Sequence, residues 1–579
     1  EIVTWIKDEK SRYANLIKPD DLTSDVSSFL PHLRATRPDI IAAMEKKPWQ
    51  IPGAAFIAGQ RQVILADKPG LGKTLQTVAA LLELDIRGPI LVIAPRSAVN
   101  VTWPDEIQQW VGDNEDITII NSSISARDRS TAIARILTAD PSERHWVFMG
   151  PNYLRISADT DDYGNYVRDN KGNKIIRTVR EAVPEVFGIK WSAIIVDECH
   201  QTLAGSKGDK KKQSAQRQGL GALSLVQDAP MIAISGTPFR GKTENIWGTL
   251  NWLFPKKYTS SWNFFKRHYG VTESFSQFGS GIVKGDTVLD ERKFYEELRP
   301  IMVRRTKEEI QKCLPPDKRM PPKQYGGTRL DHNDPESPVA VWLPMSKEQR
   351  KQYDKVVSDA IIYLDDVVEV NVNGALAEMT RFKQLANATL GGWETDDSGL
   401  LRPCMPSNKI DWCLDFADDR LSAGTKIIIA SQFTQFLELM SGQFKSAKFP
   451  HYLFTGKTSD KQRAEIKKGF QGDGDMIILL NTISGGASLN LDMADDVVIC
   501  DKTWNPDDQE QVEDRAHRPA SERLHSVTIW NLNSLDTIDE DIALVNAQRE
   551  QQSFAVLDGV RGMKYTKELI SMTKKRASK

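Results

Sequence analysis

Nine short runs rich in Val, Ile and Leu, each ended by a loop, constrain the fold of this 579-residue chain more than any other feature. Continuous apolar runs of this length are typical of central parallel strands, which are buried on both faces. Helical patterns separate the runs, and strands that alternate with helices predict an α/β fold with parallel sheets. The runs form a group of five at 62–67, 89–95, 145–150, 192–198 and 231–237, and a group of four at 425–431, 451–456, 475–481 and 496–501.

The two groups predict two α/β domains, which we place at 47–310 and 407–546. The segment CLPPDKRMPPKQYGG, which follows the first domain, is rich in Pro and Gly and is typical of a linker. An alternating pattern around a turn at 169–172 predicts an inserted β-hairpin. The other predicted parts are an N-terminal helical segment at 1–46, the hairpin insertion at about 157–190, a helical protrusion at about 247–298, a linker with a second helical protrusion at 311–406, and a C-terminal brace or tail at 547–579.

Composition narrows the class of protein. Charged residues make up 27% of the chain and hydrophobic residues 40%, which is typical of a soluble globular protein. The formal net charge is −2, so any contact with nucleic acid must come from local patches. The five cysteines form no C-x-x-C pair, so we expect no zinc site, no disulfide framework and a reducing compartment. No apolar run is long enough to span a bilayer. We therefore expect a cytoplasmic protein, or a nuclear one if the source is eukaryotic, without a membrane partner.

The stretch DKPGLGKT at 67–74 lies between the first apolar run and a helix with apolar periodicity. Glycines let the backbone turn sharply there and bring N–H groups close to phosphate oxygens. A Lys at this place reaches the β- and γ-phosphates of a nucleotide, and the hydroxyl after it coordinates Mg²⁺. Asp67 replaces the first Gly of the usual pattern. The predicted nucleotide contacts are Gly70, Leu71, Gly72, Lys73, which is also catalytic, and Thr74, which is also a metal ligand.

A second motif, IIVDECH, ends another apolar run at the place where a Walker B strand delivers carboxylates. We expect Asp197 to hold Mg²⁺, directly or through water, and to belong to the nucleotide site. We expect Glu198 to orient and deprotonate the attacking water. His200 has two interpretations, a surface histidine or a link between this site and SGTP at 235–238.

Taken in order, the motifs resemble those of superfamily-two helicase motors: DKPGLGKT, DECH, SGTPFRGKTENIW at 235–247 and QVEDRAHR at 511–518. The resemblance is closer to the Swi/Snf-type ATPases, through RPIMVRRTKEEIQKCLPP, KIIIASQF and ICDKTWNPDDQEQVEDRAHR. It covers about residues 45 to 545. It implies two tandem RecA-like P-loop domains with parallel sheets, in addition to the helical protrusions and the inserted hairpin.

The resemblance also implies roles for single residues. Gln50 in KPWQIPGAAFI resembles the glutamine that reads adenine. Arg515 and Arg518 resemble arginine fingers, which are catalytic and contact the nucleotide; three residues apart, they share one helical face. Gly486 is a further nucleotide contact. In the family, these arginines and the P-loop lie in different lobes, so the nucleotide would sit in the cleft and be completed when the lobes close.

A nucleic-acid surface is implied as well. APRSAVNVTW at 94–103 resembles the loop that grips phosphates in the first lobe, and NTISGGASLNL at 481–491 resembles the matching surface of the second. The charged run at 206–218 is either a solvated loop or a backbone contact. The implied nucleic-acid contacts are Arg96, Ser97, Thr237, Gln432, Thr482, Ser484, Gly485 and Trp504.

These features lead to the hypothesis of an ATP- and Mg²⁺-dependent motor that translocates on DNA, mainly duplex, during replication, recombination or repair. We expect the protein to be monomeric and to interact with replication or recombination proteins. One alternative is a helicase that separates strands or remodels forks. Another, of a different class, is a nucleotide-gated DNA clamp with little turnover. An RNA-remodelling enzyme is disfavoured by the Swi/Snf-like segments.

Overall fold

The computed structural model divides into two compact units, Glu1–Arg319 and Met320–Lys579, and each is described by itself. The described residues are 26–96, 98–121, 124–159, 161, 165, 167–170, 172, 175–178, 183–203, 215–226, 229–236, 238, 246–259, 261–268, 271–276, 279–284, 291–314, 319–334, 337–366, 372–395, 401–472, 476–482, 491–503, 506–517 and 525–544.

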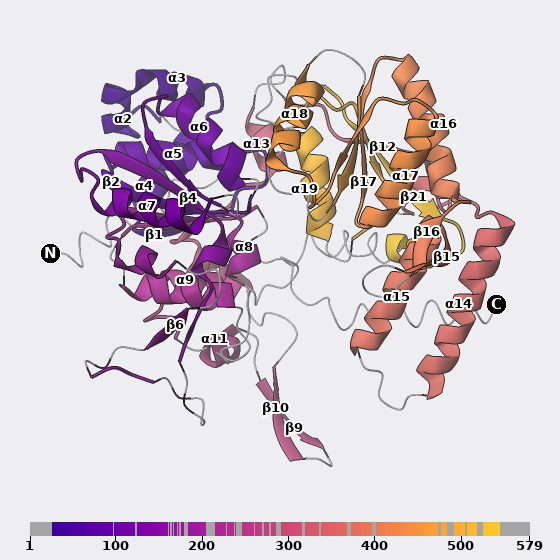
Figure 1. The fold of residues 1–579 in the computed structure, drawn as a ribbon, viewed down its shortest axis with the longest axis horizontal. Coiled ribbons are helices and arrows are strands. Elements are labelled where there is room, and N and C mark those ends of the chain that lie inside the picture. The colour runs from indigo at the N-terminus through magenta and orange to yellow at the C-terminus, as the bar shows by residue number, and fades with distance from the viewer. Residues whose placement is uncertain are drawn as a thin grey trace. The chain divides into compact units, whose positions relative to one another are not determined.

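The first unit is built on a seven-stranded sheet in the order β11-β1-β8-β7-β2-β4-β3, in which every pair is parallel (Figure 1). All five predicted runs are strands of this sheet, so the parallel α/β prediction is confirmed. Two further strands, β3 and β11, were not predicted. The strands are β1 (Gln62–Leu65), β2 (Gly88–Ile93), β3 (Asp116–Ile120), β4 (Arg144–Met149), β7 (Ala193–Val196), β8 (Met231–Ile234) and β11 (Met302–Val303).

Burial on both faces explains the continuous apolar runs. Alternate residues of a strand point to opposite faces. In β1, Ile64 belongs to one buried cluster, whereas Val63 and Leu65 belong to a second cluster on the other face. The helices of this unit are α2 (Pro31–Thr36), α3 (Pro38–Glu45), α4 (Gln50–Ala58), α5 (Lys73–Glu83), α6 (Trp103–Trp110), α7 (Ala126–Leu137), α8 (Cys199–Thr202), α9 (Ala215–Val226), α10 (Ile246–Leu253), α11 (Ser261–His268), α12 (Glu291–Leu298) and α13 (Lys307–Cys313), with a π-helix at Ala98–Thr102 and 3₁₀ turns at Pro151–Leu154 and Pro184–Gly188.

The second unit repeats this design with a sheet in the order β13-β14-β21-β20-β17-β19-β18, to which β12 adds beside β21. All four runs predicted here are parallel strands, and β13 alone pairs antiparallel within the described sheet. The strands are β12 (Gln324–Gly326), β13 (Thr328–Arg329), β14 (Val339–Leu343), β17 (Lys426–Ser431), β18 (His451–Phe454), β19 (Met476–Asn481), β20 (Asp496–Ile499) and β21 (Thr528–Ser534).

Helices cover both faces of the second sheet as well, and two separate buried clusters lie against it. Figure 1 shows α14 and α15 extending side by side from this unit, where the sequence predicts a helical protrusion. The helices are α14 (Lys347–Asp366), α15 (Val372–Asn387), α16 (Asn408–Ser422), α17 (Thr434–Ser446), α18 (Asp460–Gln471) and α19 (Pro506–Ala516).

Among the described residues, three antiparallel pairs lie outside the main sheets. The pair β5 (Ile156–Ala158) and β6 (Ile176–Thr178) lies where the sequence predicts an inserted hairpin. The segment at 247–298, for which only helices were predicted, also contains β9 (Val271–Ser276) paired with β10 (Gly279–Lys284). Similarly, β15 (Thr389–Thr395) pairs with β16 (Leu401–Cys404) inside the region predicted as linker and protrusion. Polar and Gly-rich strands such as these lack the apolar runs on which the prediction was based.

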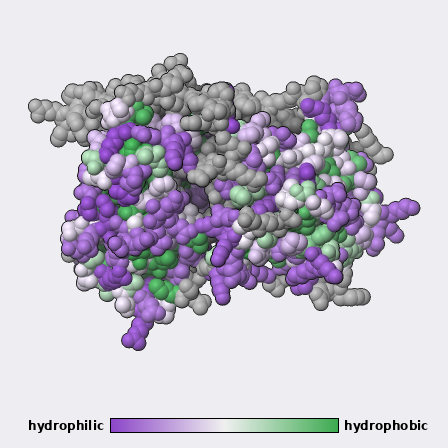
Figure 2. Space-filling view, turned by 90° about the horizontal axis from the view of Figure 1, so that it is seen from above, coloured by the Kyte–Doolittle hydropathy of each residue, from purple (hydrophilic) through white to green (hydrophobic). Residues whose placement is uncertain are grey.

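The described residues on the face shown in Figure 2 are mostly hydrophilic. On the face shown in Figure 2, hydrophobic residues are scattered among polar ones on the described part of the chain. No helix within the described ranges combines the length and apolarity that crossing a membrane requires. Nor do the side chains of these ranges include three or more His, Cys, Asp or Glu grouped as metal ligands.

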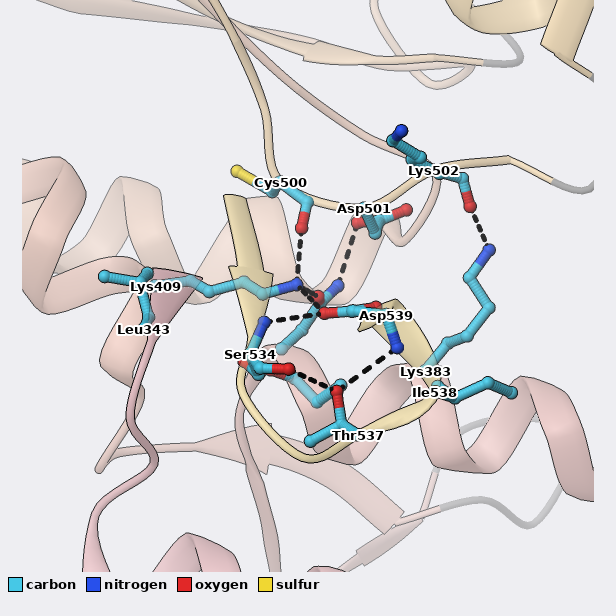
Figure 3. Close-up of polar contacts among 12 residues, drawn as sticks. Leu343, Lys383, Lys409, Cys500, Asp501, Lys502, Ser534, Thr537, Ile538 and Asp539 are labelled. Carbon is cyan, nitrogen blue, oxygen red and sulfur yellow. Dashed lines mark hydrogen bonds and ion pairs between the residues drawn. The ribbon is translucent and has the colours of Figure 1, made fainter. Parts of the chain in front are cut away.

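A buried lysine holds together three parts of the second unit at the carboxyl end of β20 (Figure 3). Lys409, at the start of α16, is fully buried, and its Nζ donates to Asp539 Oδ2 at 2.6 Å, to the Cys500 carbonyl at 2.6 Å and to Asn387 Oδ1 at 2.8 Å. Asn387 in turn donates to Asp501 Oδ2 at 2.8 Å. A lysine in this setting satisfies all three of its donors, which offsets the cost of burying its charge.

We predict that Lys409→Met destabilises the second unit by about 3–5 kcal/mol, because Asp539 would remain buried without its cation. Hydrogen exchange of peptides from β17 and β20, combined with urea unfolding, measures the change. Lys457→Met is the matched control, since the 3.9 Å pair of Lys457 with Glu438 is exposed and contributes at most about 1 kcal/mol. Equal effects of the two substitutions would contradict the role of Lys409.

Candidate functional site

The loop between β1 and α5 has the geometry of an anion-binding site. Gly72 is the N-cap of α5 with φ 74°, and Gly70 also has a positive φ, 84°. A Cβ on Gly72 would lie 2.0 Å from Gln50 Nε2, so no other residue fits there without displacing that side chain. No side chain of the described residues caps this helix, which leaves the N–H groups of its first turn to an anion. Lys73 and Thr74 begin the helix at this point.

Three side chains fix the loop by bonding to one carbonyl. The Leu71 carbonyl accepts from Trp49 Nε1 at 3.0 Å, from Gln76 Nε2 at 3.1 Å and from Gln50 Nε2 at 3.4 Å. Gln50 is 2% exposed, and its Oε1 has no hydrogen-bond partner among the described residues. A buried acceptor without a donor is costly, and the exocyclic amino group of adenine would satisfy it. The structure therefore fits the predicted role of Gln50.

Asp67 explains the departure from the usual phosphate-loop pattern. Its carboxylate is fully buried and forms an ion pair with Arg305, which follows β11. Asp67 Oδ1 accepts from the backbone N and the Nε of Arg305, both at 3.0 Å, and Oδ2 accepts from Gln76 Nε2 at 3.2 Å. The Asp67 carbonyl accepts from Lys73 Nζ at 3.0 Å. The acidic side chain thus supports the loop from the core, while the backbone keeps its place beside Lys73.

The two predicted carboxylates follow β7. Asp197 Oδ1 accepts from the backbone N–H of Glu198 at 2.8 Å, and Oδ2 accepts from Trp103 Nε1 at 3.0 Å. Burial, followed by the charge of Glu198, raises the pKa of Asp197 to about 6, whereas the bond from Trp103 and the charge of Lys73 oppose the rise. Glu198 has φ 46°, a left-handed conformation that costs a residue with a Cβ about 1–3 kcal/mol. Such strain is found mainly at functional sites.

His200 connects the carboxylates with the loop after β8. Its ring is 3% exposed, and its Nδ1 lies 2.8 Å from Ser235 Oγ and 3.2 Å from Glu198 Oε2. The predicted link between His200 and the segment 235–238 is therefore confirmed as a contact. Because the carboxyl ends of parallel strands meet at one edge of a sheet, the loops after β1, β7 and β8 converge there.

The predicted site residues of the second unit that the structure describes differ in burial and in hydrogen bonding. Arg515, in the last turn of α19, is only 8% exposed. Gln432 uses its amide nitrogen within the unit, donating to Asp501 Oδ1 at 2.8 Å and to the Lys502 carbonyl at 3.3 Å. Thr482 is 2% exposed, so a direct contact by its hydroxyl would require its neighbours to move. In the first unit, Arg96 is exposed beyond the end of β2. All four roles stay predictions.

The other predicted site residues lie outside the described part of the chain. They are Ser97, Thr237, Ser484, Gly485, Gly486, Trp504 and Arg518, together with most of the charged run at 206–218. Sequence reasoning missed four residues that the structure places at the site, because each is a tertiary partner rather than part of a local pattern: Trp49, Gln76, Trp103 and Arg305.

The edge of the first sheet could thus hold a nucleotide with its cation. The start of α5 and Lys73 suit the phosphates, Thr74 and Asp197 offer the oxygen ligands that Mg²⁺ prefers, and Glu198 is a candidate base for a water molecule. A buried carboxylate with a raised pKa next to a second carboxylate is typical of such sites, because a bound cation stabilises both charges.

Comparisons with known proteins identify the family to which the chain is similar. The family model "SNF2-related domain" matches residues 3–322, and the model "Helicase conserved C-terminal domain" matches residues 408–520. The human "SWI/SNF-related matrix-associated actin-dependent regulator of chromatin subfamily A member 1" is 25% identical over 499 residues, which cover 83% of this chain and 40% of that protein. The yeast "Transcription regulatory protein SNF2" is 24% identical over 533 residues, covering 87% and 27%.

The solved structure "Sulfolobus solfataricus SWI2/SNF2 ATPase core in complex with dsDNA" aligns with a TM-score of 0.34 and 20% identity, covering 91% of this chain and 94% of that one. The chain spans 40% or less of the length of the two relatives named above. The first family model alone matches more than half of the sequence. Together with the two P-loop-type α/β sheets and the Swi/Snf-like motifs, this match shows that the chain belongs to the SNF2-related family.

Proposed function

We propose that this chain is a motor that hydrolyses ATP and translocates along DNA, mainly duplex DNA. The observation that carries the proposal is the convergence, at one edge of the first sheet, of a glycine-capped helix start with two carboxylates that follow β7. In the proposed site, Gln50 reads the adenine and Lys73 binds the β- and γ-phosphates. Thr74 and Asp197 would hold Mg²⁺, which supplies charge neutralisation of the phosphates.

Hydrolysis requires a base, and Glu198 takes that role. It accepts a proton from the water that attacks the γ-phosphate. His200 lies between Glu198 and the loop after β8, with its Nδ1 3.2 Å from Glu198 Oε2 and 2.8 Å from Ser235 Oγ, and we propose that this proximity restricts the position of Glu198. The loop after β8 therefore influences the position of the base, which would let a change in that loop alter the rate of hydrolysis.

The second unit contributes Arg515 and Arg518, which we propose act on the γ-phosphate of the nucleotide bound by the first unit. This step joins residues of both units and is supported by the order of the motifs. Binding and release of the nucleotide then alternate the contacts of the two units with one strand, through contacts with the phosphate backbone that include Arg96. Such contacts are largely independent of sequence.

The choice of DNA over RNA is supported by the relatives. They include a human "Chromodomain-helicase-DNA-binding protein 1", 24% identical, and an Arabidopsis thaliana "Probable ATP-dependent DNA helicase CHR23", 25% identical. The second of these names also favours the alternative of a helicase that separates strands or remodels forks. For the pathway we propose replication, recombination or repair.

We predict that duplex DNA raises the steady-state rate of ATP hydrolysis more than single-stranded DNA or RNA does. Because the grip is on phosphates, the apparent affinity for DNA should fall by roughly 10³ between 50 and 200 mM salt for about six phosphate contacts. A titration with duplex, single strands, forks and RNA measures both effects. Stimulation by RNA alone would contradict the proposal, and DNA binding without turnover would favour the clamp. Strand displacement on forks would favour the helicase.

Two substitutions test the chemistry. We predict that Lys73→Ala lowers the turnover number at least about 100-fold, because a preorganised charge on the phosphates is lost. Glu198→Gln should lower it by about 10²–10⁴, because the amide cannot accept a proton. The control is Lys190→Ala, an exposed residue before the opposite end of β7. If either variant retained the DNA-stimulated rate of the control, the site assignment would be wrong.

The substitution Arg515→Ala distinguishes an effect on nucleotide binding from an effect on the rate of hydrolysis. We predict a loss of about 10³–10⁵ in turnover, as for other arginine fingers, with unchanged affinity for a fluorescent ATP analogue, since the first unit binds the nucleotide. Arg402→Ala, an exposed arginine of the second unit, is the control. Because Arg515 is largely buried, thermal unfolding of both variants must be compared as well. A loss of turnover that only follows a loss of folded protein would refute the finger role.

A further inference from the structure

Trp103 occupies an unusual place at the start of α6. It directly follows the π-helix Ala98–Thr102, and its side chain is fully buried. The ring packs in the cluster on one face of the first sheet, with its centroid 6.4 Å from that of Phe148 in β4. From there its indole N–H reaches the end of β7 and donates to Asp197 Oδ2 at 3.0 Å. A core tryptophan is thus bonded to a carboxylate of the nucleotide site.

The bond fixes the orientation of the Asp197 carboxylate. An indole has one donor and no acceptor, so the direction of this bond is unambiguous. The other oxygen, Oδ1, accepts from the backbone N–H of Glu198 at 2.8 Å. Each carboxylate oxygen has about two lone pairs. With one donor on each oxygen, the carboxylate cannot rotate freely, but one lone pair on each oxygen is still available to a cation or its water.

Hydrogen bonds of this kind alter the affinity of a site for its metal. A ligating carboxylate is usually held by hydrogen bonds from residues that do not touch the metal, and removal of such a partner typically costs about 10–100-fold in metal affinity or activity. The charge of Lys73 acts on the same carboxylate. Trp103 differs from Lys73 because it lies in the core and has no access to the nucleotide, so it can act only through Asp197.

The helix that begins with Trp103 is anchored at its other end. Arg37 donates to the carbonyl of Trp110 at 2.7 Å and to that of Val111 at 3.2 Å. In the π-helix before Trp103, Asn100 Oδ1 accepts from Asn121 Nδ2 at 3.0 Å. Single π-turns are frequent at functional sites. A shift of this turn would therefore be transmitted to Trp103 rather than absorbed by the far end of α6.

We propose that Trp103 is a positioning residue that holds Asp197 in the orientation needed for Mg²⁺ and links it to the π-helix Ala98–Thr102. This inference rests on the proposed function, in which the segment around this π-helix contacts DNA. It gives a physical route by which DNA contact changes the metal site: movement of the π-helix moves the indole, and the indole moves the carboxylate.

The test compares Trp103→Phe, which removes the N–H and keeps an aromatic ring, with Trp110→Phe on the same helix. Trp110 donates its indole N–H to Glu106 at 2.8 Å and is the matched control. Binding of a fluorescent ATP analogue to the full chain is measured without DNA over a range of Mg²⁺ concentrations. We expect Trp103→Phe to require about 10–100-fold more Mg²⁺ for half-maximal binding, with unchanged affinity in EDTA. Wild type and Trp110→Phe should share one midpoint.

An unchanged Mg²⁺ midpoint in Trp103→Phe, with wild type binding normally, would overturn the inference but not the proposed function. Failure of the wild type to bind the analogue at any Mg²⁺ concentration would overturn both. Because Phe leaves a gap in the core, Trp103→3-benzothienylalanine provides a second variant, whose ring has nearly the same volume but no N–H. If that variant had the wild-type midpoint, packing rather than the hydrogen bond would be responsible, and the inference would be wrong.

The link to the π-helix has its own readout. If the indole transmits DNA contact, Trp103→Phe should lower the ratio of DNA-stimulated to basal hydrolysis at saturating Mg²⁺, whereas Trp110→Phe should keep the wild-type ratio. A wild-type ratio in Trp103→Phe would refute the transmission, even if the Mg²⁺ midpoint had moved.

Discussion

The ion pair between Asp67 and Arg305 is the contact on which the proposed nucleotide site depends. The two residues are 238 positions apart and join the loop after β1 to the segment after β11, at the edge of the sheet. Gln76 bonds to both partners, at 3.2 Å to Asp67 and at 2.7 Å to Arg305, and so ties α5 to them. A buried pair of this kind adds little net stability, because desolvation offsets the attraction. Its value here is geometric, since the phosphate loop cannot move without uncovering a buried charge.

The sheets show which part of a fold the sequence predicts well. The nine apolar runs are strands because a central parallel strand must be apolar on both faces, and that requirement is visible residue by residue. The strands that were missed have other requirements. β3 is at the edge of its sheet and begins with Asp116, and β11 has only two residues. β21 has the sequence TIWNLNS, whose Thr, Asn and Ser residues interrupt any continuous apolar run although the strand lies inside the sheet.

The candidate site shows which functional residues a sequence alone can indicate and which it cannot. Lys73 and the pair Asp197–Glu198 were predictable because backbone turns and strand ends carry local signatures. Trp103 and Arg305 were not, since each acts across a tertiary contact that no spacing reveals. In the sequence, Trp103 ends the segment APRSAVNVTW, whose resemblance implies only a contact with phosphates. The bond to Asp197 connects the end of this loop with the carboxylate that we propose as a ligand of Mg²⁺.

In the second unit, different residues hold a strand-end loop in place. This loop, after β20, is held by Lys409, which donates to the Cys500 carbonyl (Figure 3). It is also held by Asp501, which accepts from Asn387 and Gln432. Both units thus place a buried charged pair, Asp67–Arg305 or Lys409–Asp539, close to a carboxyl edge of the sheet. Loops at such an edge carry ligands in α/β proteins but have few apolar contacts of their own. Buried charges supply a positional constraint that apolar packing alone would not, because a displaced charge costs several kcal/mol. The proposed function requires ligands to be held firmly within each unit, and the buried charged pairs supply that rigidity.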